Sequence, residues 1–101
     1  MKINKRELKK DQILYICGIN VIKSGRINLN RKPTMVKVEQ SLYLVSIVGS
    51  GKILSTAYPG YEVYDNVEEC QIAYQRMVDE AVDFCGKQID KFNNVIEKLK
   101  Q

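Results

Sequence analysis

The segment most suggestive of chemistry is the Gly-Ser-Gly-Lys sequence at residues 49–52, which follows an apolar run. A phosphate-binding loop has the pattern G-x-x-x-x-G-K-[ST], in which glycine amides wrap the phosphates while the lysine and the hydroxyl contact the terminal phosphates and magnesium. Ser46 stands in place of the first glycine and Ile53 in place of the serine or threonine. The residues after Lys52 are also strand-like, so the segment predicts a β-hairpin turn whose glycines adopt positive φ.

Candidate catalytic residues are scarce. The chain contains no histidine, the side chain that most often performs acid–base chemistry near neutral pH. Neighbouring carboxylates such as Glu68 and Glu69 lie where the solvent-facing side of a helix would carry them. We therefore expect a non-enzymatic protein that works by binding, without catalytic residues and without a cofactor.

Cysteine usage indicates a reducing compartment. The cysteines Cys17, Cys70 and Cys85 are odd in number and include no C-x-x-C pair, and without histidine they predict neither a disulfide framework nor a metal site. The basic N-terminus lacks the uninterrupted apolar centre and the cleavage site of an export signal. No segment approaches the ~18 apolar residues of a membrane span. These features predict a soluble cytoplasmic protein that does not enter membranes.

Charge is distributed unevenly along the chain. Residues 1–37 carry ten lysines and arginines against two acidic residues, a net charge of +8, whereas residues 38–101 carry six against ten, a net charge of −4. Either the two halves face each other within the fold or between protomers, or the basic half binds nucleic acid or a small nucleotide, with tyrosines stacked on a base. Ordinary turn and packing roles are the alternative. The candidate ligand-binding residues are Lys23, Arg26, Arg31, Lys32, Tyr58 and Tyr61.

Short strand-like segments follow one another over residues 1–64. Asn4 and Glu7 have the spacing of a capping box, which predicts one helical turn before the first strand. Gly18 and Asn20 interrupt the apolar run of that strand and indicate a bulge. The pattern predicts five or six antiparallel strands in a sheet or a small, partly open barrel. The predicted strands are 13–22, 26–30, 34–40, 42–48, 53–58 and 61–64, with turns at 24–25, Pro33, 49–51 and 59–60.

The apolar pattern changes to a helical period at Asp65. Asp65 or Asn66 can cap the N-terminus, and the absence of proline up to residue 101 allows one helix of up to ~50 Å. Gly86 could instead divide it into two shorter antiparallel helices, but the apolar register runs through this glycine, so we favour one continuous helix. The first apolar stripe, which we expect to pack on the sheet, is Val67, Cys70, Tyr74, Met77 and Ala81.

A second apolar stripe, with heptad spacing, begins at Val78 and continues to the end of the helix. A stripe of this length is either core or an interface with another helix. It exceeds what one small sheet can cover, so we expect it to mediate self-association or partner binding. The expected interface residues are Val82, Cys85, Ile89, Phe92, Ile96 and Leu99.

The predicted fold class is α+β, in a single domain over residues 1–101 with a β-rich part at 1–64 and a C-terminal helix at 65–101. A short lead-in ("KRELKKDQ"), a first strand ("ILYICGI"), several hairpins and a turn into a closing helix ("YEVYDNVEEC") resemble the small accessory proteins of phages and prophages. The resemblance implies an anti-defence protein that binds a host protein stoichiometrically as an oligomer. It carries no site residues across, and the basic β-domain that binds nucleic acid or a nucleotide stays the alternative.

Overall fold

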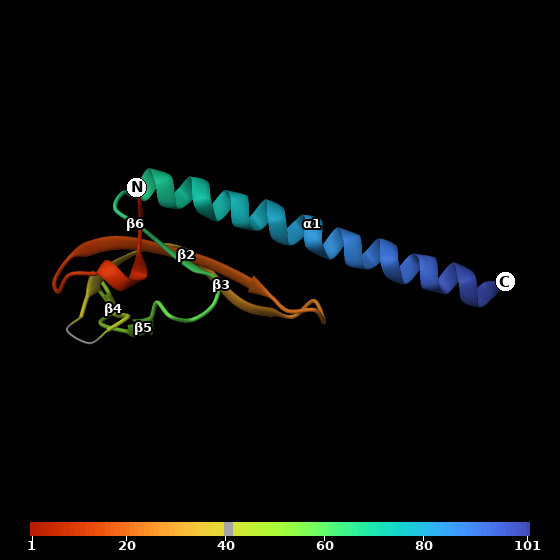
Figure 1. Ribbon diagram of the computed structural model, residues 1–101, viewed down its shortest axis with the longest axis horizontal. Helices are drawn as coiled ribbons and strands as arrows, with labels where there is room; N and C mark the ends of the chain where they lie inside the picture. The colour runs from red at the N-terminus through yellow and green to blue at the C-terminus, as the bar shows by residue number, and fades with distance from the viewer. Residues whose placement is uncertain (40–41) are drawn as a thin grey trace.

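The computed structural model describes residues 1–39 and 42–101, which form one β-sheet and one long helix (Figure 1). The elements are β1 (Lys2–Ile3), the 3₁₀ turn η1 (Lys5–Glu7), β2 (Ile13–Val21), β3 (Ile27–Val38), β4 (Leu44–Ile47), β5 (Ile53–Ser55), β6 (Tyr61–Tyr64) and α1 (Val67–Lys100). The strands pair in the order β1-β6-β2-β3-β4-β5, and every pair is antiparallel. The α+β prediction is therefore confirmed, as an open sheet whose edges are β1 and β5.

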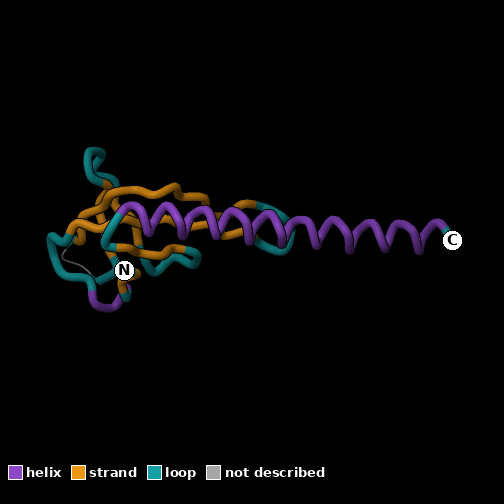
Figure 2. Tube along the Cα trace, turned by 90° about the horizontal axis from the view of Figure 1, so that it is seen from above, coloured by secondary structure: helices purple, strands orange, loops and turns teal. Residues whose placement is uncertain are grey.

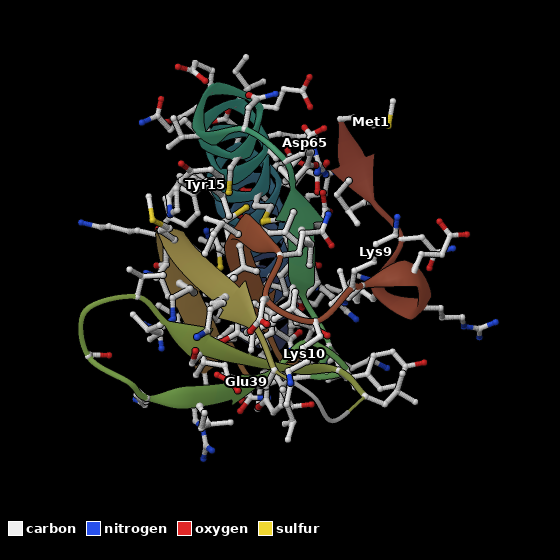
Figure 3. The ribbon with its side chains drawn as sticks, turned by 90° about the vertical axis from the view of Figure 1, so that its left-hand side faces the viewer. Met1, Lys9, Lys10, Tyr15, Glu39 and Asp65 are labelled. Atoms are coloured by element: carbon white, nitrogen blue, oxygen red, sulfur yellow. The ribbon has the colours of Figure 1, made fainter. Side chains whose placement is uncertain are left out.

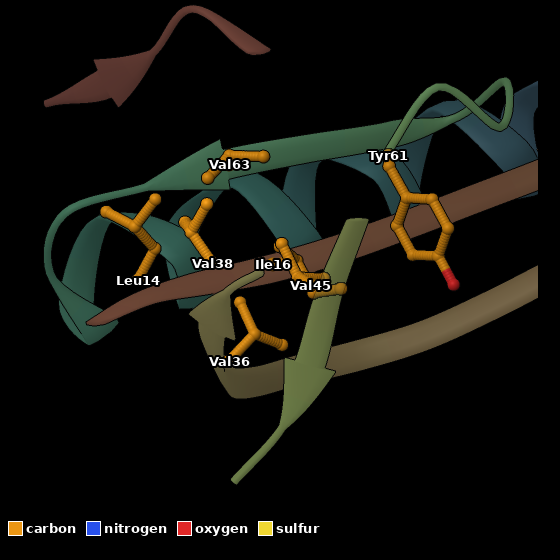
Figure 4. Close-up of a cluster of buried hydrophobic side chains, with 7 residues drawn as sticks. All are labelled: Leu14, Ile16, Val36, Val38, Val45, Tyr61 and Val63. Atoms are coloured by element: carbon orange, nitrogen blue, oxygen red, sulfur yellow. The ribbon is translucent and has the colours of Figure 1, made fainter. Parts of the chain in front are cut away.

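The main core lies on the face of the sheet that points away from α1. Because side chains alternate along a strand, Leu14 and Ile16 of β2 point to this face together. The sheet curls so that Val45 of β4 reaches the same cluster, as Figure 4 shows. Burial of this apolar surface is the main stabilisation of the sheet. The buried members of the cluster are Leu14, Ile16, Val36, Val38, Val45, Tyr61 and Val63.

The opposite face of the sheet is covered by the first half of α1, which lies above the strands when the molecule is viewed from its end (Figure 3). Cys17 of β2 and Tyr64 of β6 meet Cys70, Ala73 and Met77 of the helix in a second buried cluster. The Cys17 thiol donates to the carbonyl oxygen of Cys70, with Sγ and O 3.6 Å apart. Both cysteines are free thiols used for packing between sheet and helix.

The expected turn at Pro33 is wrong, because β3 continues through this residue as one strand. The pairing of β2 with β3 shifts here: Ile16 lies opposite Thr34, whereas Gly18 lies opposite Arg31. Between these two pairs β3 therefore carries one extra residue, which is a β-bulge. Proline has no N–H to give to a neighbouring strand, and a bulge is a place where a strand tolerates it. The bulge expected near Gly18 is confirmed, with the extra residue on the partner strand.

The β4–β5 hairpin confirms the turn expected at residues 49–51. Leu44 pairs with Ser55 across the hairpin. Gly49 and Gly51 adopt φ of 93° and 69°, values that glycine reaches without strain. The strand β5 comes directly after this turn, whereas a phosphate-binding loop leads from a strand into a helix.

The boundaries of other strands differ from the prediction. The segments expected at 26–30 and 34–40 are the single strand β3, and the expected end at Gln40 lies outside the described residues. β5 ends at Ser55 rather than at residue 58. Tyr43, which lies across from the end of β5, has a positive φ of 65° and turns the chain away from the regular ladder.

The helix α1 begins after Asn66, whose side-chain oxygen accepts a hydrogen bond from the Glu69 N–H at 2.8 Å. It runs through Gly86 to Lys100, which confirms the continuous helix. Its first half packs on β2, β3 and β6, whereas its second half projects beyond the sheet (Figures 1 and 2). The molecule is consequently 62 Å long and 24 Å across in the other two directions.

Candidate functional site

The second half of α1 carries a row of apolar side chains, here called the helix stripe. The stripe residues lie along one side of the helix because they recur at intervals of three and four. Their exposed fractions are 66% for Val82, 59% for Ile89, 61% for Phe92, 48% for Ile96 and 79% for Leu99, while Cys85 is half-buried. The six predicted interface residues therefore form one surface, and five of them face solvent.

The structure adds one residue to this surface. Val95 is 48% exposed and lies next to Ile96, so it widens the stripe on one side. The sequence prediction missed it because Val95 falls outside the heptad spacing. Its position next to Ile96 could have indicated that the apolar surface is wider than the heptad positions alone. In the first half of the helix, reasoning likewise missed Ala73, which packs on the sheet beside Tyr74.

A groove of about 500 Å³ separates the start of the helix stripe from the β2–β3 hairpin. Val82 and Cys85 line the helix wall, and Val21 and Ile27 line the hairpin wall. Gly86 also lines it, and a Cβ added there would meet no atom within 4 Å among the described residues. The groove is therefore an open apolar cleft, and the missing side chain of Gly86 leaves additional space along its helix wall.

A smaller hollow of about 190 Å³ continues the groove under the hairpin turn, where Lys23 and Gly25 face Ile89 and Phe92. The hairpin ends at this level, and the helix continues past it (Figure 1). The helix stripe consequently has two parts. Residues 82–92 face the hairpin across the groove and the hollow, and residues 95–99 project beyond the hairpin.

The structure does not bring the six predicted ligand-binding residues together. Lys23 and Arg26 flank the β2–β3 turn at one end of the sheet, whereas Lys32 is exposed at the bulge of β3. Tyr58 and Tyr61 form an edge-to-face pair with ring centroids 6.3 Å apart. Tyr61 is only 6% exposed and belongs to the main core, so its ring face is already covered.

Arg31 lies across Gly18 from Tyr61, because Gly18 pairs with Arg31 on one side and with Tyr61 on the other. Gly18 has no room for a side chain, since an added Cβ would lie 2.9 Å from both the Gly60 oxygen and the Leu29 Cδ2. In the part of the chain that the structure describes, the buried Nε of Arg31 has no hydrogen-bond partner. Arg31 is therefore a half-buried neighbour of the core that lies in the same row of the sheet as Tyr61, apart from Lys23 and Arg26 at the β2–β3 turn.

A different basic pocket forms between the N-terminal segment and β6, here called the N-terminal pocket. It measures about 670 Å³, and its lining includes Lys2, Lys5, Arg6 and Tyr43. Burial, and then the charge of Lys2, lower the pKa of Lys5, and the Glu62 carboxylate in the same pocket offsets them only in part. Sequence reasoning missed this pocket because no local pattern links the N-terminal residues with Tyr43. Only the pairing of β1 with β6 brings them near each other.

No protein-family model, no curated protein and no solved structure matches this chain. Within residues 1–39 and 42–101, no helix has the length and apolar content needed to cross a bilayer. Across the same described ranges, no three cysteine or acidic side chains gather as a metal site would require. The surfaces themselves are therefore the basis for inferring a function.

Proposed function

We propose that the protein is a non-enzymatic binding protein that acts by stoichiometric protein–protein contact as an oligomer, with its helix stripe packed against a second copy of the chain. The observation that carries the proposal is the row of exposed apolar side chains on the half of α1 that has left its own sheet. Contiguous exposed apolar surface of this kind marks association sites in folded proteins.

Covering the stripe would stabilise an assembly. The five large stripe side chains are between 48% and 79% exposed, and covering each contributes on the order of 1 kcal/mol. A two-fold contact uses the same row from both copies, so about ten side chains contribute. The total lies within the roughly 4–15 kcal/mol that association loses in translational and rotational freedom. The apolar gain is therefore of the same size as this loss, so charge and shape complementarity along the stripe decide the strength of the association.

The charges around the stripe favour a second copy as its occupant. Asp79 borders one end and Lys100 borders the other, and the bordering residues Gly86, Gln88 and Asn93 between them are uncharged. A surface with opposite charges at its two ends and none between them is complementary to a reversed copy of itself.

An anti-defence role is the part of the proposal that rests on the resemblance to phage accessory proteins. A stoichiometric inhibitor needs no nucleophile and no general base, so a chain without histidine is compatible with it. In that role the oligomer is the acting form, and a host protein is its target.

Light scattering on the wild-type protein and on a Phe92→Asp/Ile96→Asp variant tests the proposal. We expect a dimeric wild type and a monomeric variant, because a carboxylate is unfavourable on a surface from which water has been excluded. The matched control is Asn94→Asp/Gln101→Glu, which adds the same two negative charges on the other side of the helix and should leave the dimer intact.

Circular dichroism on all three proteins separates dissociation from unfolding. A wild type that stays monomeric overturns the second copy as occupant and leaves a different protein as the partner of the stripe. A double mutant that unfolds while the control folds would show instead that the stripe belongs to the core.

A second candidate function is the binding of a nucleotide or single-stranded nucleic acid in the N-terminal pocket. The observation that favours it is the grouping of Lys2, Lys5 and Arg6 beside Tyr43. Basic side chains neutralise phosphates, and an aromatic ring can stack on a base. A bound phosphate would also add negative charge beside Lys5, whose pKa is lowered by burial and by Lys2.

Fluorescence anisotropy with a labelled single-stranded oligonucleotide and with a labelled ATP analogue tests this second candidate. A Lys5→Glu/Arg6→Glu variant should lose most of the affinity, and a Lys23→Glu/Arg26→Glu variant, with the same change of charge at the hairpin turn, should keep it. Equal losses in both variants would show diffuse attraction rather than a pocket. No binding by the wild type at about 50 mM salt would exclude the nucleic-acid version.

A further inference from the structure

We infer that two copies pair their helix stripes antiparallel, so that Ile96 and Leu99 of the partner subunit fill the groove between α1 and the β2–β3 hairpin. The inference rests on the proposed function and specifies its geometry. In this arrangement Val82 lies opposite Leu99 of the partner subunit, and Cys85 lies opposite Ile96 of the partner subunit.

The heptad spacing selects this register. The stripe residues alternate between two heptad positions, one held by Val82, Ile89 and Ile96 and the other by Cys85, Phe92 and Leu99. In an antiparallel pair, a residue at the first position faces a residue at the second position of the partner subunit. Centring the pair between Ile89 and Phe92 gives a partner to each of the six stripe residues. Displacement by one heptad in either direction leaves at least one of them, such as Leu99, without an opposite residue.

Side-chain size along the stripe also favours the antiparallel direction. The N-terminal half of the stripe has smaller residues, including Val82 and Cys85, whereas the C-terminal half has Phe92 and Ile96. An antiparallel pair places large residues opposite small ones in each outer layer. A parallel pair would place Cys85 opposite Cys85 of the partner subunit and Phe92 opposite Phe92 of the partner subunit. The first layer would then be loosely packed and the second would be overpacked.

The position of the sheet gives an independent reason. The hairpin lies beside residues 82–92, and residues 95–99 project beyond it (Figure 1). In a parallel pair, both sheets would lie at the same end of the stripe, beside the two grooves. Neither groove would then receive the projecting end of a helix. Antiparallel helices place each sheet beside the free end of the other helix, and that free end enters the groove.

Electrostatics favours the same direction. The antiparallel register brings Asp79 of one copy close to Lys100 of the partner subunit, and the two-fold axis repeats this pair at the other end of the stripe. A parallel pair would leave Asp79 and Lys100 of the partner subunit at opposite ends of the stripe, too far apart to attract each other. The helix dipoles are also aligned favourably only when the helices run in opposite directions.

The native Cys85 allows a direct test by disulfide cross-linking with diamide, which accepts the two electrons and two protons that two thiols release. The wild type should give no covalent dimer, because the two Cys85 residues are eleven positions out of register, roughly 16 Å along the helix. Ile96→Cys should convert most of the chain to a covalent dimer, since the new thiol lies opposite Cys85 of the partner subunit.

Cys85→Ala/Ile96→Cys is the matched control and should give no covalent dimer. Cys17 and Cys70 are fully buried and cannot take part while the protein is folded. A covalent dimer of the wild type, or of the control, would overturn the antiparallel register. Absence of cross-linking in Ile96→Cys, when light scattering shows that the same variant is dimeric, would overturn it too.

A charge-exchange series provides a second measurement that does not depend on thiols. Asp79→Lys and Lys100→Asp should each raise the dimer dissociation constant several-fold, and the double variant should return it toward the wild-type value. Additive losses in the double variant would contradict the pairing. If the wild type is monomeric by light scattering, the proposed function fails with the inference, whereas a dimer with the wrong cross-link refutes only the geometry.

Discussion

Arg76 of α1 holds Glu62 of β6 in a two-point ion pair, with Nη2 2.7 Å from Oε1 and 3.0 Å from Oε2. The Tyr64 hydroxyl donates to the same Oε1 at 2.6 Å. Burial alone would raise the pKa of Glu62, but the hydrogen bonds from Tyr64 and Arg76 outweigh it and lower this pKa. The group ties the last strand to the helix just before the helix leaves the sheet.

Replacing Arg76 should destabilise the fold. Arg76→Gln leaves the largely buried Glu62 carboxylate with a weaker partner, Lys2 at 3.6 Å, and should lower the free energy of unfolding by about 1 kcal/mol. Because the folded-state pKa of Glu62 is depressed, this contribution is present above the usual glutamate pKa and is lost as the pH falls through the folded value. Urea unfolding at pH 7 and at pH 3 measures both effects.

The control for Arg76→Gln is Lys87→Gln, which removes another helix cation from an ion pair. Lys87 lies 3.0 Å from Asp83, and both side chains are mostly exposed. The loss here should be below about 0.5 kcal/mol. Equal effects of the two substitutions would show that the Glu62 pair does not strengthen the junction of sheet and helix.

Tyr64 should titrate above the ordinary range of a tyrosine hydroxyl. Burial, and then the hydrogen bond to Glu62, raise the pKa of Tyr64 to about 12. Because the folded state holds this proton more tightly than the unfolded chain does, its contribution is complete below the ordinary tyrosine pKa. The contribution is then lost as the pH rises from 10 to about 12.

Absorbance at 295 nm between pH 9 and pH 12.5 follows the tyrosine ionisation. Tyr64→Phe should remove a late step from the curve, and the wild type should lose stability relative to this variant over the same range. A Tyr64→Phe curve that lacks an early step instead would contradict the assignment.

Gly18 and Gly86 should respond in opposite ways to the same chemical change. An added Cβ at Gly18 meets a backbone oxygen at 2.9 Å, so Gly18→Ala should destabilise by about 1–3 kcal/mol. Gly86 is helical and open, so Gly86→Ala should stabilise by about 0.5–1 kcal/mol. Thermal unfolding of both variants is the measurement, and a shift of the same sign in both would be inconsistent with the structure.

Thiol reactivity should distinguish the three cysteines. Cys17 and Cys70 are fully buried and should react with a thiol reagent only after unfolding, whereas Cys85 is half-buried and should react in the folded chain. If the helix stripe is covered by a second copy, Cys85 should react more slowly in the wild type than in Phe92→Asp/Ile96→Asp. Equal rates in these two folded proteins would show that Cys85 is not at the interface.

The sequence predicted well where one residue type has one physical use. Asn66 caps the helix, and Gly49 and Gly51 turn the hairpin, because few other residues suit those backbones. The turn predicted at Pro33 was wrong because proline interrupts a regular strand ladder but is tolerated at a β-bulge. Only the pairing of β2 with β3 distinguishes these two cases.

The two candidate sites differ in how far they could be predicted, because one lies within a single helix and the other joins distant segments of the chain. The helix stripe follows from spacing within one element, so the position of its six residues on one side of the helix could be predicted, while their use as an interface stays a prediction. The N-terminal pocket is made by Lys5 and Tyr43, which are distant along the chain, and the scattered positions of Lys23, Arg31 and Tyr58 depend on strand order. Local periodicity carries no information about such long-range contacts.

The projecting helix also determines how the molecule moves in solution. The radius of gyration of its Cα atoms is 17.2 Å, whereas a compact chain of this length has about 13 Å. A single 11.6 kDa chain will therefore diffuse slowly for its mass and elute from a size-exclusion column in the position of a heavier globular protein. Its tumbling will be anisotropic, so NMR relaxation of an amide will depend on the angle between its N–H vector and the helix axis. In the proposed antiparallel pair, the two-fold axis would place one sheet, with its N-terminal pocket, at each end of the paired helices.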